Sequence, residues 1–180
     1  MLRIASSFVN VPIASLHAGF RIGRLQRPII NPNRLNIEAF ICEGERLDVN
    51  ACLLAKDVRE VAADGVLIDH QEDIVPLADL IRLQDIVKIN FQLIDKKVYT
   101  ESNSKLSIGK VSDFVIDDRD FLIMKLYVKR PAWRAIASNQ LVVARNQIVK
   151  VTDSRVVVKD AVVKVSDERK VPSPQPTPAN

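Results

Sequence analysis

The chain has 180 residues, 47% hydrophobic and 27% charged, which is typical of one folded domain or two small ones and unlike a disordered chain. Val and Ile together number 41 whereas Gly numbers 5, and β-branched side chains favour strands. The longest uncharged stretch, residues 4–20, is too polar and too short to span a bilayer, so we expect no membrane span and a cytoplasmic location.

Charge is unevenly distributed along the chain. Residues 1–95 carry 10 Lys and Arg against 13 Asp and Glu, whereas residues 119–180 carry 12 against 5. This asymmetry indicates an anionic partner for the second half. The alternative is an ordinary solvated basic face, and the pattern alone does not choose between them.

The first half of the chain is repeated in the second. The pattern Ile-Gly-Arg-Leu at residues 22–25 returns as Ile-Gly-Lys-Val at residues 108–111, an offset of 86. Each copy continues into a turn and an alternating strand, residues 35–43 and 122–129. Strict alternation would place Leu122, Met124, Leu126 and Val128 inward, which requires an offset of 87 in this strand. The outward pairs would then be Glu38 with Lys125, Phe40 with Tyr127, and Cys42 with Lys129.

The repeat extends through both halves. Residues 54–57 resemble residues 143–146 at an offset of 89, and residues 66–68 resemble residues 156–158 at an offset of 90. Several short strands at this spacing are typical of a small barrel or sandwich. We therefore predict a mostly β protein with two tandem small barrels, the first in residues 1–76 and the second in residues 77–165.

A short helix is predicted between the barrels. Leu80, Leu83 and Val87 recur at helical spacing between residues 76 and 90, with Ile86 beside them. The apolar stripe is typical of core packing, and a partner surface is the alternative. The tail, residues 166–180, contains four prolines and few apolar residues, so it is predicted to be disordered.

Residues 106–117 (Leu-Ser-Ile-Gly-Lys-Val-Ser-Asp-Phe-Val-Ile-Asp) and 143–151 together resemble the PRC-barrel family. This barrel occurs in the H subunit of the photosynthetic reaction centre, and a related one forms the C-terminal half of the 16S ribosomal RNA maturation factor. The first copy departs from the pattern, because Arg27 stands where the second has Asp113. The resemblance implies a non-catalytic adaptor or assembly module, with a protein partner that could include a ribosomal or other ribonucleoprotein component.

Three residues are assigned structural roles. Gly23 and Gly109 lie inside strand patterns, where glycine marks a bulge or a close approach of backbones. A phosphate-binding loop would need further glycines. Asp113 is assigned to the same turn or bulge on the strength of the resemblance.

The sequence contains no convincing catalytic or metal-binding pattern, so we expect neither an enzyme nor a cofactor. His17 and His70 are the only histidines, and the polar turn at residues 70–73 is typical of a solvated loop rather than a cation site. Cys42 and Cys52 lack metal-site spacing. Cys42, expected on the outward face near Glu38, is predicted to be unreactive.

The strongest candidate for partner binding is a cluster of cations and aromatic residues in the second half. Such a cluster suits either phosphate contact with base stacking or an anionic protein. The alternative for Trp133 is inward packing on the barrel or the helix. A protein-interaction module is the first hypothesis, direct binding of RNA or an anionic surface is the second, and self-association is the third; the oligomeric state stays open. The candidate residues are Lys125, Tyr127, Lys129, Arg130, Trp133 and Arg134.

Overall fold

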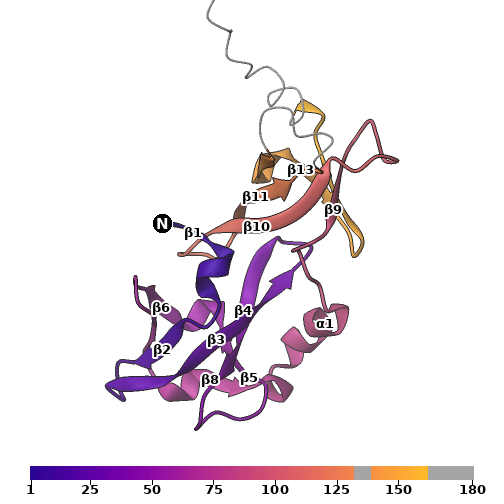
Figure 1. The fold of residues 1–180 in the computed structure, drawn as a ribbon. Coiled ribbons are helices and arrows are strands. Elements are labelled where there is room, and N and C mark those ends of the chain that lie inside the picture. The colour runs from indigo at the N-terminus through magenta and orange to yellow at the C-terminus, as the bar shows by residue number, and fades with distance from the viewer. Residues whose placement is uncertain (132–138, 162–180) are drawn as a thin grey trace, which may run out of the picture.

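The computed structural model describes residues 1–131 and 139–161. Within them the protein is mostly β, as predicted, and is built from two seven-stranded sheets and one α-helix (Figure 1). None of the helices in this part of the chain is long and apolar enough to cross a membrane.

Sheet B is formed by the first half of the chain and curls into a half-barrel. Its strand order is β6-β7-β2-β3-β4-β5-β8, and β2 with β7 is its parallel pair. The strands are β2 (Pro12–Ser15), β3 (Phe20–Asn31), β4 (Asn36–Glu43), β5 (Ala51–Leu54), β6 (Val58–Val61), β7 (Val66–Ile68) and β8 (Ile74–Pro76).

Sheet A is formed mainly by the second half, in the order β12-β11-β10-β9-β14-β13, with β9 and β14 parallel. One strand departs from the predicted division of the chain: β1 lies in the first 76 residues but pairs with β10 of sheet A. The strands are β1 (Leu2–Ile4), β9 (Lys97–Thr100), β10 (Gly109–Asp117), β11 (Ile123–Lys129), β12 (Gln140–Ala144), β13 (Ile148–Val151) and β14 (Arg155–Val158).

The strand register shows that the repeat has one offset, 86, through its first two long strands. In sheet B, Arg24 pairs with Glu43, and in sheet A, Lys110 pairs with Lys129. The predicted offset of 87 is wrong because a β-bulge leaves Met124 without a partner on β10, and this interrupts the alternation. The first copy carries the same bulge at Glu38. The later strands keep one offset of 90, so the value of 89 predicted for residues 54–57 is also wrong.

The bulges change which side chains face the core. Ile123 is fully buried, whereas Met124, predicted to be inward, is only half-buried. Phe40 and Cys42, predicted to face outward, are 1% and 3% exposed. By register, the residues equivalent to Lys125, Tyr127 and Lys129 are Ala39, Ile41 and Glu43. The outer face of the first copy is therefore largely apolar rather than acidic.

Helix α1 (Ile81–Ile89) lies in the interval 76–90, where helical spacing was predicted, and it covers the outer face of sheet B (Figure 1). Its buried Leu83 forms a cluster separate from the main core. Asn90 ends the helix in the left-handed conformation. The part of sheet B that lies under the helix, in β3, β4 and β5, is consequently buried on both faces. The buried sheet residues under the helix are Ile29, Ala39, Ile41 and Cys52.

The two sheets meet through equivalent residues. Asn36 forms a bridge with Leu122, its counterpart at the offset of 86. The Ile37 N–H donates to Phe121 O and the Ile123 N–H donates to Leu35 O, each at 2.9 Å. Leu35 and Phe121 both have positive φ, 47° and 54°. The junction is thus approximately two-fold symmetric, with the same strained turn used from both sides.

Side chains reinforce this junction. The rings of Phe8, Phe40 and Phe121 pack with centroids 5.6–6.2 Å apart. Arg145, in the 3₁₀ turn η6 (Arg145–Gln147), donates to Leu35 O at 2.8 Å, Ile123 O at 2.9 Å and Arg34 O at 2.6 Å. The side chain therefore binds carbonyls of the turn between β3 and β4 and of β11.

A second tie lies at β1. The Arg3 guanidinium donates a hydrogen bond to Asp118, in the turn after β10 of sheet A, at 2.9 Å and also donates to the carbonyl of Val61 in sheet B. Burial opposes ionisation of Asp118, but hydrogen bonds from the α-amino group of Met1 and from Arg3 outweigh it and lower the pKa of Asp118.

Candidate partner-binding surface

The two strand glycines lie where backbones approach closely. A Cβ atom on Gly23 would lie 2.6 Å from Glu43 O, and one on Gly109 would lie 2.5 Å from Lys129 O. Neither distance is compatible with a side chain, which explains glycine at both equivalent positions. The register shift in β10 comes after Gly109, between Val111 and Asp113, so a bulge at Gly109 itself is not observed.

A groove of about 520 Å³ lies beside Gly109. Three neighbouring strands and the chain after β11 supply its cations, Lys97, Lys110, Lys129 and Arg130, and we call it the basic groove. Asp95 is the carboxylate among the described residues that line it. The lysines are exposed, and none of these three is paired with a carboxylate in the described part of the chain. The groove therefore carries excess positive charge.

The equivalent groove beside Gly23 has a different charge. It has a volume of about 860 Å³. Its lining includes Glu43 and Glu45 together with three arginines, and Glu43 accepts a hydrogen bond from Gln26. The repeat preserves the groove, but only the second copy makes it strongly basic.

The predicted partner-binding residues divide between two places. Lys129 and Arg130 line the basic groove. Lys125 is exposed and Tyr127 is half-buried on the outer face of β11, opposite Ala144 and Val142 of β12. Trp133 and Arg134 lie outside the described residues, as does the tail 166–180.

Two groove lysines were missed by sequence reasoning. Lys110 immediately follows Gly109, and its position beside a buried valine at 111 could have marked it as outward-facing. Lys97 gave no such signal, because it enters the groove only through the pairing of β9 with β10.

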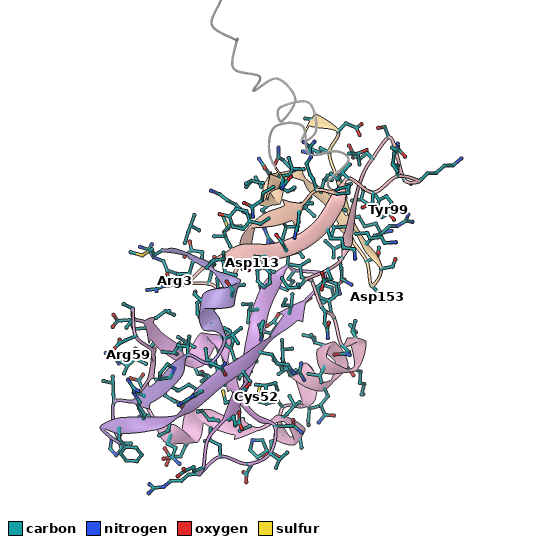
Figure 2. All side chains as sticks on the ribbon, in the orientation of Figure 1. Arg3, Cys52, Arg59, Tyr99, Asp113 and Asp153 are labelled. Atoms are coloured by element: carbon teal, nitrogen blue, oxygen red, sulfur yellow. The ribbon has the colours of Figure 1, made fainter. Side chains whose placement is uncertain are left out.

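Asp113, labelled in Figure 2, lies on β10, and the strand register pairs it with Tyr127. Its carboxylate accepts a hydrogen bond from the Phe114 N–H at 2.8 Å. The carboxylate thus accepts a backbone hydrogen bond next to the register shift. Its negative charge offsets part of the positive charge on this face.

Both thiols are buried in sheet B, Cys42 in the main core and Cys52 under α1 (Figure 2 labels Cys52). Desolvation raises the pKa of each thiol to about 12. The thiols are therefore protonated at neutral pH and poor nucleophiles.

The two histidines lie together although they are distant in the sequence. The rings of His17 and His70 have centroids 5.1 Å apart. Nearby, Asp69 forms an ion pair with Arg59 at 2.7 Å. The Asp73 carboxylate accepts a hydrogen bond from the backbone N–H of His70 at 2.9 Å. Within residues 1–131 and 139–161, no three metal-ligating side chains come together.

The basic groove and the outer face of β11 and β12 are therefore the surfaces that distinguish the second copy from the first. A scan against protein-family models finds no match, and a search of curated proteins finds no similar sequence.

Proposed function

We propose that the protein is a non-catalytic adaptor of the PRC-barrel type that binds an acidic protein segment in the basic groove. The observation that carries the proposal is the set of four cations around Gly109 with one carboxylate among them. Ribonucleoprotein components are the class of partner that we favour, on the family resemblance.

The chemistry of the groove suits a peptide chain. Cations from adjacent strands lie where carboxylates of an extended segment can reach them, and such complementarity raises association rates and selects partners. Leu106, which is 41% exposed, and Pro131 add apolar contact at the rim.

The hydroxyls of the groove support a binding role rather than a catalytic one. The Ser107 hydroxyl donates to the carbonyl of Gly109 at 2.8 Å, and the Ser112 hydroxyl donates to the carbonyl of Tyr127 at 3.2 Å. A nucleophilic serine needs a neighbouring base, and both of these are engaged with the main chain.

RNA is the competing ligand for the same cations. Sequence-tolerant binding of single strands combines cations with aromatic platforms for the bases. No aromatic side chain lines the basic groove among the described residues. An acidic protein segment is therefore the better fit, and RNA becomes an outcome of the test.

The test measures binding of labelled polyglutamate and oligo(U) RNA to the full chain by fluorescence anisotropy at several salt concentrations. The double variant Lys97→Glu, Lys110→Glu should bind polyglutamate about tenfold or more weakly, since each position changes from attraction to repulsion. Lys150→Glu, Lys159→Glu makes the same charge change on exposed lysines of the same half and is the matched control.

Equal loss of polyglutamate binding in both double variants would show that binding depends on net charge alone, and would refute the groove as the binding site. If oligo(U) binds more tightly than polyglutamate and its binding falls steeply with salt, the ligand of the groove is RNA rather than a protein segment. In a pull-down from native lysate, partners that survive ribonuclease and disappear with the groove variant would support the adaptor.

A further inference from the structure

The outer faces of the two sheets are equivalent, but within residues 1–131 and 139–161 a helix covers the face of sheet B and none covers the face of sheet A. In sheet B, α1 packs over β3, β4 and β5. The register places residues of β10, β11 and β12 at the same positions in sheet A. The equivalent pairs are Ile29 with Val115, Ala39 with Lys125, Ile41 with Tyr127, and Cys52 with Val142.

Exposure shows the difference directly. Cys52 is fully buried beneath α1, whereas the equivalent Val142 is 49% exposed. Tyr127 is only half-buried, although its counterpart Ile41 is 8% exposed. Val115 on β10 is 7% exposed, nearly as buried as its counterpart Ile29 at 5%, so the open part of the face lies on β11 and β12. The described part of the chain places no helix over this face of sheet A.

The charge of the open face indicates what would fit it. Lys125 replaces Ala39, and Lys129 replaces Glu43, so two cations flank the apolar centre formed by Tyr127 and Val142. The carboxylate on this face, Asp113, accepts a hydrogen bond from the backbone.

We propose that this docking face, defined as Lys125, Tyr127, Lys129 and Val142, binds an acidic amphipathic helix of a protein partner in the position that α1 takes on sheet B. The inference rests on the proposed function as an adaptor but uses a different surface from the basic groove, with Lys129 at the border of the two.

The mode of contact follows from α1. That helix contacts sheet B through a stripe formed by Leu80, Leu83, Ile86 and Val87. A partner helix with the same stripe would cover Val142 and the ring of Tyr127, leaving the phenol hydroxyl at the edge. Acidic side chains beside the stripe would meet Lys125 and Lys129, whose stems can lie along the apolar surface.

The probe is a helical peptide copied from residues 77–90 of the chain itself. Arg82→Glu and Lys88→Glu make it acidic without changing its stripe. An amide link from an Ile81→Lys side chain to Asp85, two exposed positions of α1, holds the helix, because isolated helices of this length are marginal in water. The control peptide carries the same link but retains Arg82 and Lys88.

Binding to the full chain is followed by anisotropy, and the binding surface is mapped by ¹⁵N chemical shifts. We expect the acidic peptide to bind more tightly than the control and to shift Lys125, Tyr127 and Val142. Val142→Glu should weaken binding about tenfold or more by placing a carboxylate in the centre of the face. Val149→Glu is the matched control, since Val149 is 48% exposed on β13, and should stay within about twofold.

A charge swap keeps the proposal testable if Val142→Glu impairs folding. Lys125→Glu, Lys129→Glu should reverse the preference, so that the control peptide binds more tightly than the acidic one. No shift at β11 and β12, or an unchanged preference after the swap, would overturn the proposal. The groove variant Lys97→Glu, Lys110→Glu separates the two proposals. It should lose polyglutamate, whereas the acidic peptide, although weakened by the new carboxylate opposite Lys129, should still shift Tyr127 and Val142.

Discussion

Arg145 provides the sharpest test of how the two sheets are held together. Its guanidinium donates hydrogen bonds to three main-chain carbonyls, of which Arg34 O and Leu35 O belong to the first half and Ile123 O to the second. The position equivalent to Arg145 at the offset of 90 is Ala55, so the first copy has no counterpart of these three hydrogen bonds, which we call the Arg145 clasp. Removing the guanidinium should weaken the junction from one side only.

The magnitude follows from what each carbonyl loses. A hydrogen bond to a charged donor contributes about 1.5–3 kcal/mol when taken alone. Leu35 O retains the Ile123 N–H as a donor, and water can replace the guanidinium at the exposed Arg34 O. We therefore expect Arg145→Met to lower the free energy of unfolding by about 3 kcal/mol rather than by the sum of three bonds. In a chain of this size the melting temperature should fall by about 6–12 °C.

The assay is urea unfolding followed by circular dichroism. Arg145→Lys should recover about 1 kcal/mol, because one ammonium cannot serve three acceptors. Arg82→Met removes an exposed arginine of α1 and should change stability by less than about 0.5 kcal/mol. Equal midpoints for Arg145→Met and Arg82→Met would refute the assignment of Arg145 as a clasp.

Three further outcomes are expected. Gly109→Ala should destabilise the fold by about 2–3 kcal/mol, since its Cβ would lie 2.5 Å from Lys129 O. Cys42 and Cys52 should not react with Ellman's reagent at pH 8 in the native protein, because their raised pKa values keep them protonated, and both should react after unfolding in guanidinium. Asp118→Asn should destabilise the protein at pH 7, and the difference from the unmutated chain should shrink as the pH falls through the lowered pKa of Asp118.

Each of these has its own control. Gly19→Asn should cost less than about 1 kcal/mol, because Gly19 has a φ of 73° that Asn tolerates and open space around it. A native protein that titrates both thiols within minutes would contradict their burial. Because the pKa of Asp118 is lowered, its ionised carboxylate stabilises the folded protein at pH values above the usual aspartate pKa of about 3.9. A stability difference between Asp118→Asn and the unmutated chain that grows as the pH falls would contradict the ion pair with Arg3.

The sequence was sufficient to predict a mostly β protein, because β-branched composition and period-two alternation are local signals. It failed where tertiary packing interrupts the local period. Met124 and Glu38 are bulge residues, and a bulge shifts the face of every residue beyond it. Phe40 and Cys42 appeared outward because the register prediction did not include that bulge.

The candidate site was only partly predictable for a related reason. The grouping of Lys125 with Tyr127 could be proposed from the sequence, since the two alternate along one strand. The grouping of Lys97 with Lys110 depends on a pairing between strands separated by a loop. The pairing of β1 with β10 was equally out of reach, because a three-residue strand carries little pattern of its own.

The junction between Leu35–Ile37 and Phe121–Ile123 also affects how many partners one molecule can bind. Because the halves meet through equivalent residues, two separate copies of one half could close in the same way, as a two-fold dimer with two identical outer faces. Within a single chain that identity is broken, since α1 occupies one face. If the open face takes a helix as proposed, the chain would hold one partner helix in one orientation and act as a directional, one-to-one connector, which a symmetric dimer cannot be.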